Sequence, residues 1–146
     1  MSKTVKQICI GTLPLWVGIL VNAVISYFPI PIFLFSIIYL FLWAYLCYRA
    51  CDPKASAVKQ ALNLCLFGLV MFLLVTYQEC VRGEYWMNYA GILTQMYFLP
   101  ALSAGVFLLR PFMEVLTVYS AYVVEMVLLA ALCLLGCALK VKKARK

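Results

Sequence analysis

The most constraining feature of this sequence is an apolar run over residues 112–139 that contains two acidic residues, Glu114 and Glu125. Because an α-helix rises about 1.5 Å per residue, roughly 20 apolar residues cross the hydrocarbon of a bilayer. This run is long enough to cross, and the basic tail 140–146 follows it directly. We therefore expect a transmembrane helix with a carboxyl group near its centre.

Four more apolar segments fill most of the remaining chain, over residues 8–28, 32–48, 60–78 and 89–109. The composition is 67% hydrophobic and 12% charged, whereas soluble domains contain about 25% charged residues. The stretches between the segments are too short for a soluble domain of about 50 residues or more. The sequence predicts an all-α integral membrane protein, a small helical bundle forming a single transmembrane domain over residues 1–146.

The number of crossings depends on the 89–109 segment, which is interrupted at Pro100. If all five segments cross, the basic residues divide evenly between the two sides. If this segment is re-entrant, ten basic residues gather on one side and only Arg82 and Arg110 lie on the other. The positive-inside rule favours this second arrangement, with four crossings and both termini cytoplasmic, in the cell (plasma or inner) membrane. Five crossings are the alternative.

Glu125 is the main candidate for a functional side chain. Glu114 and Glu125 are 11 residues apart, so they lie within about 20° of each other around a helix. An unpaired carboxylate inside the bilayer costs several kcal/mol, so Glu125 is interpreted either as a protonated group that bonds to a neighbouring helix or as a proton or cation site. Glu114, nearer the end, is expected to be solvated. The candidate polar neighbours in other segments are Asn22, Asn63, Gln95 and Ser103.

The cysteines form a second constellation, because two pairs lie four residues apart near segment ends: Cys47 with Cys51, and Cys133 with Cys137. With four crossings these thiols lie at one depth, and soft thiolates bind Cu(I) or Zn. Packing as small apolar side chains is the simpler interpretation. Six of the seven cysteines lie in apolar runs or beside basic clusters, and C-x-x-C is absent, so neither a secreted disulfide framework nor a thiol oxidoreductase is expected.

The remaining charged and aromatic residues point to the bilayer as the partner. Basic residues sit in short clusters at segment ends, which is typical of contact with anionic lipid or a partner protein and not of nucleic-acid binding. The aromatic residues of the second segment, including Tyr39 and Trp43, are interpreted as facing lipid or the interface. The tail residues expected to contact lipid or a partner are Lys140, Lys142, Lys143, Arg145 and Lys146.

Catalytic motifs are absent from the sequence. It has no histidine, no glycine-rich phosphate loop and no G-x-S-x-G. We therefore expect a non-enzymatic membrane subunit without a cofactor, which assembles as a homo-oligomer or with a partner chain, for example as the membrane arm of a cytosolic sensor or effector. The alternative is a small ion or proton channel or transporter that uses Glu125. A thiol-based Cu or Zn carrier is a lesser alternative.

Overall fold

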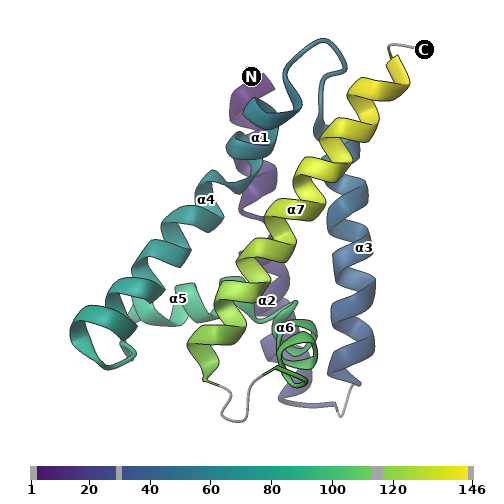
Figure 1. Cartoon of the computed structure of the whole chain (residues 1–146). Helices are drawn as coiled ribbons and strands as arrows, with labels where there is room; N and C mark the ends of the chain where they lie inside the picture. The colour runs from purple at the N-terminus through teal and green to yellow at the C-terminus, as the bar shows by residue number, and fades with distance from the viewer. Residues whose placement is uncertain (1–2, 29–30, 113–116, 145–146) are drawn as a thin grey trace.

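The structure, a computed structural model, describes residues 3–28, 31–112 and 117–144 (Figure 1). These residues form α-helices and one π-helical turn, and this part of the chain contains no β-strand. The elements are α1 (Lys3–Gly11), α2 (Leu13–Ile25), α3 (Ile32–Ala50), α4 (Ala57–Tyr77), η1 (Gln78–Arg82), α5 (Tyr89–Phe98), α6 (Leu102–Leu109) and α7 (Val118–Ala144).

Four stretches of helix are long and apolar enough to cross a membrane: Lys3–Ile25, Ile32–Ala50, Ala57–Arg82 and Val118–Ala144. The pair α5 and α6 is bent by 64° at a short break, and it would add a fifth span only if counted as one. The expected all-helical architecture with four candidate spans and an interrupted fourth apolar segment is therefore confirmed for the described residues.

The first and last helices begin and end at residues other than those expected. The first segment, expected over 8–28, starts at Lys3 and ends at Ile25, and a break at Thr12, just before Pro14, divides it into α1 and α2. The last, expected over 112–139, begins at Val118 and continues through the basic residues to Ala144. Hydropathy marks the apolar part of a helix, whereas lysine is itself a good helix former. Glu114 lies outside the described residues.

One end of the bundle gathers the start of α1, the end of α3, the start of α4 and the end of α7 (Figure 1). We call it the basic end. Lys3 forms an ion pair with Asp52 in the α3–α4 loop, and the Lys140 ammonium lies 4.8 Å from the centre of the Tyr48 ring. In the described part of the chain, the basic residues at this end are Lys3, Lys6, Arg49, Lys54, Lys59, Lys140, Lys142 and Lys143.

The helices approach one another at glycines. A Cβ on Gly18 of α2 would lie 1.7 Å from the carbonyl oxygen of Met96 in α5. A Cβ on Gly136 of α7 would lie 2.9 Å from the carbonyl oxygen of Ala44 in α3, and Gly68 of α4 faces the Tyr97 hydroxyl. Small residues let helix backbones approach closely in membranes, and here those approaches are made within one chain.

Candidate functional site

The Glu125 carboxyl is enclosed in the interior of the bundle. The side chain is 0% exposed and lies about two turns into α7, in the half of the helix farther from the basic end. Neither carboxyl oxygen forms a hydrogen bond. Buried polar groups are bonded in the great majority of cases, so this pair of unpartnered oxygens requires an explanation.

The break between α5 and α6 faces this carboxyl. Pro100 is buried there and has no N–H, and Ala101 is the residue that precedes the first turn of α6. The backbone N–H of Ala101 lies within electrostatic range of the Glu125 carboxyl, although it does not complete a hydrogen bond. The start of a helix carries a partial positive charge. The break therefore presents a favourable potential to a negative charge on Glu125.

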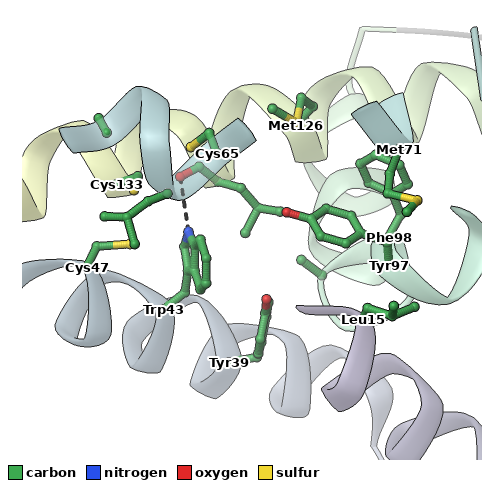
Figure 2. Close-up of a cluster of buried hydrophobic side chains, with 14 of the residues drawn as sticks. Leu15, Tyr39, Trp43, Cys47, Cys65, Met71, Tyr97, Phe98, Met126 and Cys133 are labelled. Atoms are coloured by element: carbon green, nitrogen blue, oxygen red, sulfur yellow. Dashed lines mark hydrogen bonds between the residues drawn. The ribbon is translucent and has the colours of Figure 1, made fainter. Parts of the chain in front are cut away.

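Tyrosine hydroxyls from three helices surround the same interior. Tyr39 of α3, Tyr97 of α5 and Tyr122 of α7 all lie within electrostatic range of Glu125. The Tyr39 hydroxyl is buried and has no hydrogen-bond partner. In Figure 2 the hydroxyl ends of Tyr39 and Tyr97 both point toward the middle of the buried cluster. The Trp43 indole N–H donates to the carbonyl oxygen of Leu129 at 3.2 Å.

The interpretation of Tyr39 and Trp43 as facing lipid is wrong, because they are 2% and 0% exposed. The buried residues of α3 are Ser36, Tyr39, Trp43 and Cys47. Their spacing of three and four residues places them on one face of the helix. That periodicity was the available signal, and the abundance of aromatic residues on the other faces masks it.

The polar residues expected beside Glu125 are not brought together with it. Asn22 is exposed and Gln95 is half-buried on α5. Asn63 donates to the Gln7 side-chain oxygen at 3.1 Å, at the basic end of the bundle. Ser103 forms a hydrogen bond with Ser36 of α3 at 2.7 Å.

A polar network closes the basic end. Gln7 donates to Gln60 at 2.9 Å, and Gln60 donates to the backbone oxygen of Asp52 at 2.9 Å. Asp52 also accepts a hydrogen bond from the Lys54 backbone N–H at 3.0 Å. The Lys3 ammonium and this N–H hold the pKa of the Asp52 carboxyl below its usual range. The network ties α1 to the α3–α4 loop and to α4.

The four cysteines of α3 and α7 lie together at this end, in two layers. Cys51 and Cys137 form a disulfide, and Cys47 and Cys133 lie one turn deeper as buried free thiols. Among the described residues, no group of three or more histidine, cysteine, aspartate or glutamate side chains is arranged to hold a metal ion. The expected Cu or Zn site therefore gains no support.

The basic tail continues α7. Lys142 and Lys143 line a groove together with Tyr48 and Leu139, between the ends of α3 and α7. Arg145 and Lys146 lie outside the described residues. The expected contact of the tail with anionic lipid or a partner protein stays a prediction.

No family model, curated protein or solved structure matches this chain. Any functional assignment therefore depends on the geometry around the Glu125 carboxyl and around the cysteines at the basic end.

Proposed function

We propose that this chain is a small proton-coupled membrane protein, of the channel or transporter class, in which Glu125 binds and releases a proton. The observation that carries the proposal is the fully buried carboxyl whose two oxygens are unpartnered beside the α5–α6 break. Ionisable residues inside membrane spans are costly and typically mark proton or ion pathways. Interrupted helices are the usual place for such sites in transporters.

A proton fits this site better than a metal cation does. Hard cations such as Ca²⁺ need about six to eight oxygen ligands, whereas the interior around Glu125 offers one carboxyl group and scattered tyrosine hydroxyls. Protonation removes the charge and turns one oxygen of the carboxyl into a donor. Tyr39, whose hydroxyl has no partner, is a candidate acceptor from α3. The α6 N-terminus would stabilise the charged form after the proton leaves.

The proposed placement in the membrane has four crossings. The basic end faces the cytoplasm because it holds eight of the ten basic residues in the described part of the chain. The pair α5 and α6 enters and leaves on the opposite side, as its 64° bend allows. Re-entrant backbone is tolerated where protein covers it, and α5 packs closely on α2 at Gly18.

Proton flux through reconstituted protein tests the proposal. Liposomes with an internal pH-sensitive dye, containing the full chain, should equilibrate an imposed pH gradient faster than empty liposomes. Glu125→Gln, which keeps the shape but cannot ionise, should reduce this rate to that of empty liposomes. Glu84→Gln, at an exposed acid, is the matched control and should conduct like the wild type. Equal rates for Glu125→Gln and the wild type, at equal protein incorporation, would contradict the proposal.

A second candidate function is the membrane subunit expected from the sequence. Within the span of α3, Ile32–Ala50, only 22% of the most apolar stretch is buried inside the chain, so most of this helix is left to lipid or another protein. The small residues that could pack against a partner helix, however, already pack against helices of the same chain. Gly68 faces Tyr97, and Gly136 faces α3. Glu125→Gln also distinguishes the proton-coupled protein from the membrane subunit. If the wild type shows no proton flux, and the Glu125→Gln variant no longer forms the wild-type oligomer in light scattering, the subunit is favoured.

A further inference from the structure

The disulfide between Cys51 and Cys137 lies in the wall of an open groove at the basic end. The groove has a volume of about 290 Å³, close to the lower limit for small-molecule sites. Cys51 is 5% exposed and lines the groove, whereas Cys137 is 0% exposed and does not line it. A reactant in this groove therefore approaches the disulfide from the side of Cys51. The lining residues are Lys3, Lys6, Gln7, Ala50, Cys51, Asp52 and Pro53.

The groove carries a net positive charge. The Lys3 ammonium is paired with the Asp52 carboxylate, which leaves the exposed Lys6 as its uncompensated charge. A basic recess concentrates anions and favours thiolate over thiol. An anionic thiol is therefore the small reactant that this groove suits.

The position of this disulfide at the basic end indicates whether the bond is permanent or reversible. Basic clusters mark the cytoplasmic ends of spans, and disulfides in a reducing cytosol are mostly transient, catalytic or redox-sensing. A bond that closes this end of the bundle is then one that forms and breaks. The inference that the bond is reversible rests on the proposed cytoplasmic orientation of the basic end. The presence of the groove and its positive charge do not depend on that orientation.

We propose that Cys51 and Cys137 form a reversible thiol–disulfide exchange site whose reactant is a small anionic thiol that enters the groove and attacks Cys51. The thiolate RS⁻ forms a bond to the Cys51 sulfur, the Cys51–Cys137 bond breaks, and the electron pair leaves on the Cys137 sulfur, which takes the proton that RSH released. A second thiolate attacks the R sulfur of the mixed disulfide and releases Cys51. Two RSH become RSSR, and the disulfide becomes two thiols.

Reduction can be measured as the number of thiols that alkylate in the intact full-length chain in nanodiscs. The exposed free cysteines Cys9 and Cys80 are first replaced by serine to lower the background. Glutathione should make two further cysteines alkylate, Cys51 first and the fully buried Cys137 more slowly, and glutathione disulfide should reverse this. The proposal fails if both alkylate before any reductant is added, or if they stay protected by the disulfide until the chain is unfolded.

The direction of attack is tested with two variants, each of which lacks one of the two disulfide cysteines. In Cys137→Ser, glutathione disulfide should form an adduct at Cys51 at least about tenfold faster than it forms one at Cys137 in Cys51→Ser, because reactivity follows access and thiolate character. Equal rates, or faster reaction at Cys137, would overturn the proposed entry through the groove.

The charge of the groove is tested in a chain that keeps both Cys51 and Cys137. The result therefore does not depend on how the Cys51→Ser and Cys137→Ser variants fold. Lys6→Gln should slow reduction by anionic glutathione several-fold and leave reduction by cationic cysteamine unchanged or faster. Cys47→Ser, which removes a buried thiol outside the groove lining, is the control and should react like its parent. The same slowing with both reductants would show that Lys6 acts on structure and not on the reactant. Because none of these readouts depends on proton flux, their failure is distinguishable from failure of the Glu125 proposal.

Discussion

Asp52 and Glu125 are carboxyls in opposite environments. Asp52 lies in a loop and is held by the Lys3 ammonium and the Lys54 N–H, whereas Glu125 is buried without a partner. The pKa of Asp52 is therefore lowered in the folded chain. A group with a lowered folded pKa adds stability above its unfolded pKa of about 3.9 and loses that contribution as pH falls through the folded pKa.

Asp52→Asn should therefore lower the apparent melting temperature in detergent at neutral pH, and the difference from the wild type should shrink as the solution is acidified below about pH 4. Thermal scans monitored by circular dichroism across this range measure the effect. Lys3→Gln should reproduce most of it, because the Lys3 ammonium is the main cause of the shift. A difference that grows on acidification would contradict a lowered pKa for Asp52.

Trp43 provides a second test at the level of a single residue. Its indole N–H donates to the Leu129 carbonyl in the buried core, so Trp43→Phe removes the donor and leaves a buried carbonyl with one bond fewer. The lost bond should lower the free energy of unfolding by about 0.5–1.5 kcal/mol, because the Leu129 carbonyl keeps its bond within α7. Denaturant titration in mixed micelles measures this. Trp16→Phe, at a residue that is 65% exposed, should change it little. Equal losses in the two variants would count against the bond.

Which residues surround Glu125 could not be read from the sequence. The sequence places one carboxyl in an apolar run, and that is enough to single out Glu125. Its surroundings come from α3, α5 and the α5–α6 break, which are far away along the chain. Asn63 was expected beside it because it is polar, but Gln7 satisfies it at the basic end. Side-chain polarity shows that a partner is needed, but it does not identify the partner.

At the scale of elements, the apolar segments predicted the ends of a helix to within about two residues where the flanking residues do not favour helix. The second segment, expected over 32–48, is Ile32–Ala50, and it is followed by a turn in which the Ala55 N–H donates to the Asp52 carbonyl. Pro100 correctly indicated the interruption of the fourth segment, now seen as a 64° bend. The face against which the bent pair packs could not be predicted, because it is set by the approach of α5 to Gly18 on α2.

Gly18→Ala tests this approach. The added Cβ would lie 1.7 Å from the Met96 carbonyl oxygen, so α2 and α5 must separate. Overpacking of this kind costs about 1–3 kcal/mol, occasionally more. We expect a lower free energy of unfolding and faster hydrogen exchange in α5, measured by mass spectrometry. Ala23→Val, at an exposed position of the same helix, is the control. Unchanged protection of α5 in Gly18→Ala would show that this contact is not what holds it.

At the scale of the whole molecule, the two counts of crossings differ in the side of the membrane on which the C-terminal tail lies relative to the η1 turn. With four crossings and a re-entrant α5–α6 pair, the tail lies on the side opposite Cys80, whereas with five crossings the tail and Cys80 share a side. The ion pair of Lys3 with Asp52 and the packing of Lys140 on Tyr48 place the start of α1 and the end of α7 together. That proximity supports the first arrangement.

Two labelling sites separate these arrangements in intact cells. Cys80 is exposed and free, and Lys142→Cys, in a chain with Cys9 changed to serine, places a thiol on the described part of the tail. A membrane-impermeant maleimide added outside should label Cys80 and leave residue 142 unlabelled until the membrane is opened, because basic ends are retained in the cytoplasm. Labelling of both from outside would require five crossings and a tail on the outer side. It would also remove the cytosolic reductant from the Cys51–Cys137 site, since both lie at the tail's end of the bundle.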